Sequence, residues 1–359
     1  MPMTSKPVRI LVVGLGNMGM SHAKAYHALE GFEIVGLCTR SPIAPGTLPE
    51  GFESYPQFTD YEAALAQTGP DAVSINTYTE THANYAIAAF EAGAHVFIEK
   101  PLAATVVDAE RVIESAQKHG RKLVIGYILR HHPSWEKFVE LAKTLGKPLV
   151  MRMNLNQQSS GEFWETHKRL LNSVSPIVDC GVHYLDMMCL MTAAKPISVH
   201  AMGVRLSPDV AEDMYNYGQL QVRFDDGSIG WYEAGWGPMI SETAFFVKDV
   251  IGPKGSVSIT DVEEKGAGSA DIDTHTKTNA LKLHHAATDR HGKFSHSDEI
   301  IRTDDEPDHD GLCLREQQFF LKSITENLDL TQHMTDALGS LRIALAADQS
   351  VRTGNIIML

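Results

Sequence analysis

A lysine stands at the end of an apolar run, in Glu99-Lys100-Pro101, where a proton-transfer group would serve an enzyme. The run from Ala94 to Ile98 is typical of a buried strand, and in α/β sheets the ligand crevice lies at the carboxyl ends of the strands. Desolvation at such a position lowers the pKa of a lysine, which then transfers a proton. Pro101 disfavours helical geometry at Lys100 and so restricts where its side chain points. The alternative is a lysine that simply reaches into water at a strand end.

A glycine-rich turn near the N-terminus has the spacing of a dinucleotide site. The sequence Gly14-Leu15-Gly16-Asn17-Met18-Gly19 follows the apolar run Ile10–Val13 directly and opens a helical pattern. In this context Gly14 allows a tight turn, Gly16 lets the backbone approach a pyrophosphate, and Gly19 permits close helix packing. The helix N-terminus adds unpaired N–H groups and a positive dipole. The predicted cofactor contacts of the loop are Gly14, Gly16, Asn17, Met18 and Gly19.

The choice between NAD and NADP depends on the end of the second expected strand. NAD enzymes commonly carry an acidic residue there for the ribose hydroxyls, whereas this chain has Thr39-Arg40-Ser41. Arg40 suits a 2′-phosphate, with Thr39 and Ser41 as further donors, which slightly favours NADP. The alternative is an exposed Arg40 that stacks on adenine, which is compatible with NAD.

An aspartate and a histidine form a second group of candidate residues. If Ser175–Asp186 is helical, Asp179, His183 and Asp186 lie at i, i+4 and i+7 and share one face. A carboxylate that orients an imidazole is a general acid/base arrangement, since histidine titrates near neutrality. A zinc site lacks a third ligand at a suggestive spacing. A capping aspartate beside a core histidine is the structural alternative, and the nucleotide motif together with Lys100 favours the catalytic one.

Composition limits what must position these residues. The chain has 359 residues, of which 43% are hydrophobic, so its length indicates two domains with sizeable cores. A formal charge of −14 with scattered basic residues argues against a nucleic-acid partner. No apolar run approaches the ~18 residues of a membrane span, and the first residues lack the pattern of a signal peptide. Four cysteines without C-x-x-C spacing fit a reducing compartment, so we expect a cytoplasmic protein.

Short apolar runs alternate with helical patterns from Val8 to about Tyr127, which predicts a doubly wound parallel sheet with helices on both faces. The expected strands are Val8–Val13, Glu33–Cys38, Ala72–Ile75, His95–Ile98 and Lys122–Ile125. The expected helices are Met18–Leu29, Tyr61–Ala66, His82–Ala92 and Val106–His119.

Longer alternating strands follow from about Lys147 and predict an α+β domain with a large, mostly antiparallel, open-faced sheet. An exposed sheet face of this kind favours homo-oligomerisation, as a homodimer or homotetramer. We expect three segments: residues 1–127 for the dinucleotide, 128–330 for substrate and oligomerisation, and a helical 331–359 that packs back on the first domain. The expected strands of the second are Leu149–Leu155, Ser198–Leu206, Tyr217–Phe224, Ser228–Ala234, Thr243–Ile251 and Ser256–Thr260.

The segment Asp261–Gly311 is polar and contains six histidines. It shows no helical H-x-x-x-H pattern and no Cys/His ligand set, so the interpretation is a solvated loop and not a metal site.

Three motifs in this order resemble the glucose-fructose oxidoreductase, inositol dehydrogenase and rhizopine-catabolism (Gfo/Idh/MocA) family over nearly the whole chain. They are the glycine loop, Glu99-Lys100-Pro101 and Asp179-x-Gly181-x-His183. Thr77 and His82 resemble the family's T-P-N-x-x-H turn beside the nicotinamide, although Tyr78 and Thr79 replace its proline and asparagine. The resemblance adds the following residues to the predicted cofactor contacts: Thr77, His82, Glu99 and Lys100.

The family likeness implies hydride transfer between the nicotinamide of NAD or NADP and a carbon that bears a sugar or cyclitol hydroxyl. A base must then accept the carbinol proton. His183 is the expected acceptor, with Lys100 polarising the oxygen and Asp179 positioning them; whether Lys100 or His183 takes the proton stays open. Related enzymes imply an alternative, a redox-neutral glycosidase that works by transient oxidation and elimination. A dinucleotide sensor without chemistry is the third hypothesis.

Substrate selection is expected on the first strand of the second domain and the segment after it. His167-Lys168-Arg169 is a basic cluster that suits an anionic group on a sugar, or else a solvated helix surface. The predicted substrate contacts are Tyr127, Arg130, Asn156, Gln158, Trp164, His167, Lys168, Asp179 and His183.

Overall fold

The computed structural model describes residues 6–241, 247–260, 278, 280–303 and 306–359. The chain forms two compact units. The first comprises Met1–Ile128 and His309–Leu338, and the second comprises Leu129–Asp308 and Gly339–Leu359. The segments therefore divide differently from the expected 1–127, 128–330 and 331–359, because each unit takes in a part of the C-terminal region.

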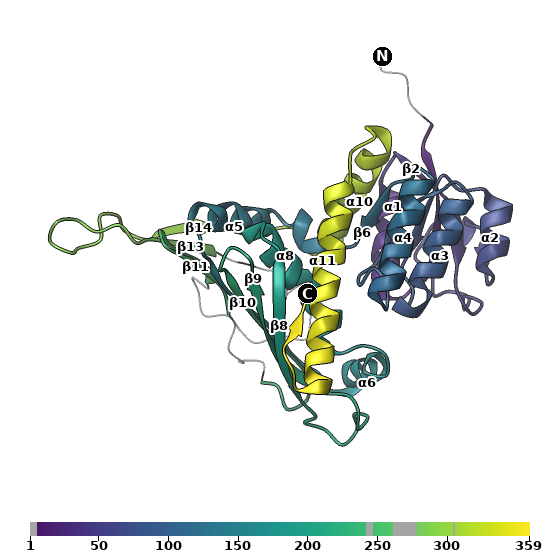
Figure 1. The fold of residues 1–359 in the computed structure, drawn as a ribbon. Coiled ribbons are helices and arrows are strands. Elements are labelled where there is room, and N and C mark those ends of the chain that lie inside the picture. The colour runs from purple at the N-terminus through teal and green to yellow at the C-terminus, as the bar shows by residue number, and fades with distance from the viewer. Residues whose placement is uncertain (1–5, 242–246, 261–277, 279, 304–305) are drawn as a thin grey trace, which may run out of the picture. The chain divides into compact units, whose positions relative to one another are not determined.

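The first unit is built on a six-stranded parallel sheet in the order β3-β2-β1-β4-β5-β6 (Figure 1). This is the strand order of a doubly wound dinucleotide-binding domain, and the predicted fold class is confirmed. The strands are β1 (Val8–Val13), β2 (Phe32–Cys38), β3 (Gln57–Phe58), β4 (Ala72–Ile75), β5 (His95–Ile98) and β6 (Leu123–Ile125). The helices are α1 (Asn17–Ala28), η1 (Phe52–Ser54), α2 (Tyr61–Thr68), α3 (Thr79–Glu91), α4 (Val106–Lys118) and α10 (His309–Thr325), with the start of α11 (Thr331–Thr353).

The ends of these elements follow from local side-chain chemistry. Asp60 caps α2 by accepting the Ala63 N–H, and Thr105 caps α4 by accepting the Asp108 N–H. Helix α10 joins this unit through apolar packing, since Phe320 is fully buried and stacks against Phe32.

The second unit contains a nine-stranded sheet in the order β14-β13-β12-β11-β7-β10-β9-β8-β15. Among the described strands of this sheet, β7 and β10 form the only parallel pair, and all other neighbours are antiparallel. The strands are β7 (Val150–Gln158), β8 (Pro196–Val204), β9 (Tyr217–Phe224), β10 (Ile229–Gly237), β11 (Lys248–Gly252), β12 (Gly255–Thr260), β13 (Ala280–His285), β14 (Glu299–Arg302) and β15 (Ile357–Met358). The helices are η2 (Ile128–His131, at the boundary of the units), α5 (Pro133–Thr144), α6 (Gly161–Leu170), α7 (Pro176–Asp179) and α8 (Gly181–Thr192).

Helices α5, α7 and α8 pack against one face of this sheet, where Figure 1 shows α5 and α8. On the other face large apolar side chains are exposed, including Met202, Val204, Ile229 and Ile251. The mostly antiparallel, open-faced sheet is thus as predicted.

Two expectations about the C-terminal third differ from the structure. The interpretation of Asp261–Gly311 as a solvated loop is wrong for its second part, where β13 and β14 extend the sheet and α10 begins at His309. The sequence of Ala280–His285 does not show the alternation of a strand clearly, because half of its residues are lysine or histidine. The end of the chain also contributes to the second unit: the Ser350 hydroxyl accepts the Ala201 N–H, and β15 pairs with β8. The first residues of the expected strand Thr243–Ile251, and residues 261–277 and 279 of the expected loop, lie outside the described residues.

Candidate active site

The glycine loop between β1 and α1 has the backbone geometry that a dinucleotide site requires. Gly14 has φ of +84°, and a Cβ there would lie 2.5 Å from the carbonyl oxygen of Asn76. A Cβ at Gly19 would lie 2.0 Å from Gly14 O, whereas a Cβ at Gly16 meets no atom within 4 Å. Gly14 and Gly19 are therefore needed for the turn itself, and Gly16 leaves open space at the N-terminus of α1. No side chain caps that helix end, so its N–H groups remain available to an anion.

A pocket lies beside this loop. It is lined by Leu15 and Met20 on one side and by Thr39 and Ser41, after β2, on the other. The Thr39 hydroxyl donates to Ser41 O over 2.7 Å, which closes the turn after β2. Arg40, between them, is exposed.

Lys100 lies at the carboxyl end of β5, half-buried, with a cis peptide bond to Pro101. Its backbone N–H donates to the Glu99 carboxylate, Oε2, over 3.1 Å. Glu99 is buried, and its other carboxylate oxygen pairs with His22 Nε2 at 2.7 Å. Sequence reasoning did not identify His22, whose only signal was a histidine on the sheet-facing side of α1.

His82 joins the turn after β4 to the segment after β5. Its Nδ1 lies 2.8 Å from Pro101 O and its Nε2 lies 3.0 Å from Thr77 O. Burial lowers the pKa of this imidazole, although both carbonyl oxygens favour the protonated ring. A neutral imidazole donates through one nitrogen only, so His82 makes one of these two hydrogen bonds at a time. The side chain holds Thr77 and Pro101 together at the end of the sheet where β4 and β5 finish.

In the second unit, the segment expected to be one helix is two. Helix α7 ends at Asp179 and α8 begins at Gly181, with Cys180 between them. The His183 N–H bonds Cys180 O over 3.2 Å, three residues back, where a continuous helix would use Asp179. Asp179, Cys180 and His183 are all half-buried. The i, i+4, i+7 face is therefore interrupted, since only His183 and Asp186 share α8.

Gln157 of β7 connects this helix junction to the sheet. Its Oε1 accepts the Trp236 indole N–H over 2.6 Å and lies 3.6 Å from the Cys180 thiol. The same thiol lies 3.3 Å from Asp179 Oδ2. Gln157 thus fixes the position of the residues just before His183, whereas Asn156, one residue earlier, points to the opposite face and donates to Glu233.

Three predicted substrate contacts on α6 have partners within the second unit. The His167 ring stacks on Trp236, with centroids 4.5 Å apart and planes 9° apart, and its Nδ1 lies 3.0 Å from the Ser159 hydroxyl. Trp164 is buried. Lys168 pairs with Glu165 at 2.7 Å, and this hydrogen bond raises the pKa of the lysine. The basic cluster is therefore partly neutralised, which weakens its case as an anion receptor.

Two further predicted contacts are taken up by structural interactions. The Arg130 guanidinium forms two hydrogen bonds with the buried Asp186 carboxylate, at 2.7 and 2.6 Å. This pair ties η2 to α8 near His183. Tyr127 is fully buried, and its hydroxyl donates to Ala337 O over 3.4 Å. Gln158 is half-buried at the end of β7.

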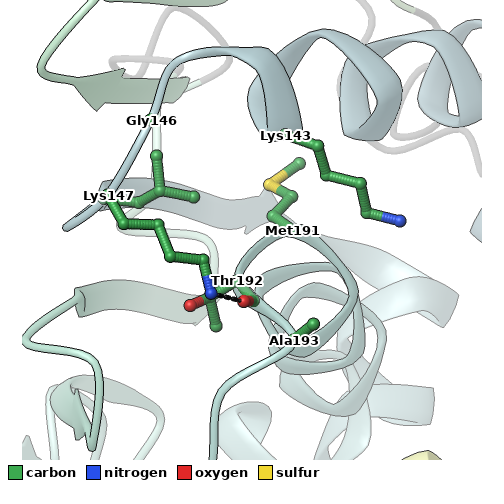
Figure 2. Close-up of a pocket in the computed structure, with 7 residues that line it drawn as sticks. Lys143, Gly146, Lys147, Met191, Thr192 and Ala193 are labelled. Atoms are coloured by element: carbon green, nitrogen blue, oxygen red, sulfur yellow. Dashed lines mark hydrogen bonds between the residues drawn. The ribbon is translucent and has the colours of Figure 1, made fainter.

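The opposite end of α8 forms a second pocket, shown in Figure 2. Lys147 donates there to Thr192 O and pairs with Asp226 at 2.9 Å. Although burial opposes ionisation, hydrogen bonds from Thr192 and Lys147 hold the pKa of Asp226 well below its usual range. These contacts satisfy the carbonyl end of α8, so the pocket belongs to the scaffold of the helix that carries His183.

Comparison with known families agrees with this arrangement. The model of the oxidoreductase family with an NAD-binding Rossmann fold, GFO/IDH/MocA, matches residues 8–127, and that of the GFO/IDH/MocA C-terminal domain matches residues 141–258. The chain belongs to the GFO/IDH/MocA family. The resemblance inferred from three short motifs is thereby confirmed, as is an NAD-binding first domain.

Curated members of the GFO/IDH/MocA family are similar at modest identity. The chain is 27% identical to the scyllo-inositol 2-dehydrogenase (NAD(+)) of Bacillus subtilis over 98% of this chain and 96% of that protein. It is 30% identical to the UDP-N-acetylglucosamine 3-dehydrogenase of Acidithiobacillus ferrooxidans over 205 residues, 57% of this chain and 61% of that protein. The match to the inositol 2-dehydrogenase of Salmonella typhimurium spans about half of that protein, 52%.

Solved structures share the fold. The scyllo-inositol dehydrogenase from Lactobacillus casei with bound NAD(H) and scyllo-inositol superposes with a TM-score of 0.76 at 21% identity, over 98% of this chain and 99% of that chain. Among the described residues of this GFO/IDH/MocA chain, no helix is long and apolar enough to cross a bilayer, and no cluster of histidine, cysteine and acidic residues could hold a metal ion.

Proposed function

We propose that this protein is an NAD(P)-dependent dehydrogenase that transfers a hydride between the nicotinamide and a hydroxyl-bearing carbon of a sugar, a sugar derivative or a cyclitol. The observation that carries the proposal is the lysine at the carboxyl end of β5, in the same parallel sheet whose strand β1 leads into the glycine loop. The similarity of the chain, over nearly its full length, to a scyllo-inositol 2-dehydrogenase supports a polyol as substrate.

The residues divide the chemistry as follows. The N–H groups at the start of α1 bind the pyrophosphate, and NAD or NADP supplies the hydride acceptor when bound. Lys100 polarises the reacting oxygen, and His183 accepts the proton that leaves as the hydride departs. Asp179 and Gln157 position His183 through the α7–α8 junction. The free thiols of all four cysteines favour a reducing compartment, the cytoplasm.

The test is a spectrophotometric screen of sugars, inositols, sugar acids and glycosides with NAD⁺ and NADP⁺. We expect absorbance at 340 nm to rise with at least one polyol. Release of an aglycone from a glycoside without net reduced cofactor would replace the proposal by a redox-neutral glycosidase. Nucleotide binding without either reaction would leave a dinucleotide sensor.

Substitution tests the assigned residues. Lys100→Ala and His183→Ala should each lower kcat by about 10²- to 10⁴-fold, because each removes a group that handles the reacting proton or oxygen. The Kd for NADH of His183→Ala, measured by fluorescence, should stay near that of the wild type. Lys118→Ala, an exposed lysine in the last turn of α4, is the matched control and should behave as wild type. Full turnover in either of the two variants would refute that residue's role.

A further inference from the structure

Beneath Lys100, four buried polar side chains of the first unit form one continuous chain of hydrogen bonds. Glu99 Oε1 lies 2.7 Å from His22 Nε2, and His22 Nδ1 lies 2.9 Å from the amide nitrogen of Gln317. The Tyr26 hydroxyl donates to the other end of the Gln317 amide, Oε1, over 2.7 Å. The relative exposures are 0% for His22 and Gln317, 1% for Tyr26 and 6% for Glu99.

The direction of every bond in this chain follows from its ends. Glu99 accepts the Lys100 N–H at Oε2, and an ionised carboxylate requires a donor at Oε1 as well. His22 must then carry its proton on Nε2, and its bare Nδ1 accepts from Gln317. The Gln317 oxygen consequently faces Tyr26, whose hydroxyl keeps its proton because burial raises the pKa of the phenol well above its usual value. With an ionised Glu99 and a neutral His22, this assignment gives each of the four groups a matching partner.

We propose that Gln317 and His22 are positioning residues, which lock Glu99 as a carboxylate in one orientation and through it fix the backbone of Lys100. Gln317 belongs to α10, so a helix from the C-terminal region of the chain controls a motif at the end of β5. The inference rests on the proposed function for the role of Lys100, but the chain of bonds is a property of the first unit alone.

The neighbouring Glu316 is a matched control within the same turn of α10. It is as deeply buried as Gln317, and neither of its carboxyl oxygens has a hydrogen-bond partner among the described residues. Its carboxyl group forms none of the hydrogen bonds from Tyr26 to Glu99, although it is close enough for Glu99 to raise its pKa. Glu316→Gln therefore tests the effect of a buried substitution on α10 without breaking the chain.

The first measurement is ¹⁵N NMR of the labelled full-length protein. We expect His22 to be neutral with its proton on Nε2 in the wild type, and to lose this preference in Gln317→Leu. The backbone amide resonance of Lys100 should shift in Gln317→Leu and stay in place in Glu316→Gln. A His22 that is an imidazolium, or that carries its proton on Nδ1, would overturn the inference.

The second measurement is the pH dependence of kcat with scyllo-inositol and NAD⁺ as the probe pair. In Gln317→Leu we expect the proton of His22 to move to Nδ1, so that the unprotonated Nε2 faces Glu99. The Glu99 carboxylate should then bind a proton at a higher pH than it does in the wild type. We expect kcat of Gln317→Leu to fall by about 10- to 100-fold, and the acid limb of its profile to move up by about one pH unit. If kcat falls equally in Gln317→Leu and Glu316→Gln, and the pH profile shifts in neither, Gln317 contributes only to packing and the inference is wrong.

Two precautions keep the outcomes distinct. If Gln317→Leu does not fold, Tyr26→Phe removes only the hydroxyl at the far end of the chain, and should shift the Lys100 amide in the same direction but less. If scyllo-inositol is not oxidised by the wild type, the proposed substrate fails while the NMR result still decides the inference. An unchanged His22 tautomer and an unchanged Lys100 amide in both variants would then reject it.

Discussion

Arg40 is the residue on which we expect the choice between the two cofactors to depend. It is exposed and follows β2 directly, while Thr39 and Ser41 line the pocket beside the glycine loop. An arginine at this place pairs with a 2′-phosphate through charge-assisted hydrogen bonds. We expect Arg40→Ala to lower kcat/KM with NADP⁺ by roughly 10-fold or more, and to leave NAD⁺ nearly unaffected, since one such bond is worth about 1.5–3 kcal/mol. An NAD⁺ preference that Arg40→Ala does not change would remove the argument for NADP.

Residues in short motifs were accessible to sequence reasoning, and residues that act across the fold were not. Gly14 and Gly19 could be identified because their backbone requirements are local and recur at a fixed spacing. Gln317 could not, because it reaches His22 across 295 residues and nothing in the polar pattern around it marks a helix face that meets α1. The pairing of Arg130 with Asp186 could not be predicted either, because the two residues lie 56 positions apart; the substrate contact of Arg130 stays a prediction.

Helix α10 has a buried carboxyl group that should set the pH dependence of stability. Burial, together with nearby Glu99, raises the pKa of Glu316 well above its usual value, so the folded chain keeps it protonated where the unfolded chain ionises. Stability should therefore fall as the pH rises from about 4.3, the unfolded pKa, towards the raised folded value. We expect Glu316→Gln to remove this slope and to be more stable than wild type at pH 8 but not at pH 4. Each kcal/mol gained corresponds to roughly 2–4 °C in Tm for a unit of this size.

Urea unfolding followed by circular dichroism between pH 4 and 9 measures this dependence. Glu326→Gln is the control, because that carboxylate lies just after α10 with its side chain 58% exposed. A Glu316→Gln curve parallel to those of the wild type and Glu326→Gln would show that Glu316 ionises freely in the folded protein.

Elements were predicted well where one physical signal dominated. The mostly apolar strands β1, β4 and β5 are largely buried on both faces, and their bounds agree with the sequence patterns. Strands β13 and β14 were missed because polar and charged residues occupy the outer positions and the flanks of strands at the edge of the sheet. The break at Cys180 was missed as well, since its backbone stays in the helical region and only the hydrogen-bond pattern changes.

At the scale of the whole molecule, the chain contributes to both units again after strand β14. Helix α10 completes the buried polar chain of the first unit, whereas Asp348 and Ser350, late in α11, bond to residues of the second. Neither unit is therefore a contiguous piece of sequence. Removal of the C-terminal region would therefore take hydrogen-bond partners from both units. The alternating pattern of the first 127 residues does not predict this dependence.

The open face of the nine-stranded sheet is the surface on which we expect two copies of the chain to associate. Its exposed apolar side chains include Met202, Val204, Ile229 and Ile251, on a protein that carries a net charge of −14, and burying them favours a symmetric pair. Because a two-fold interface contains every substitution twice, Met202→Glu should dissociate the assembly to the monomer mass of 39.5 kDa in light scattering. Val107→Glu changes an equally exposed apolar side chain on α4 and should leave the mass unaltered. A wild type with the monomer mass would show that the chain does not associate. A Met202→Glu variant with the mass of an oligomeric wild type would show that the copies associate through another surface.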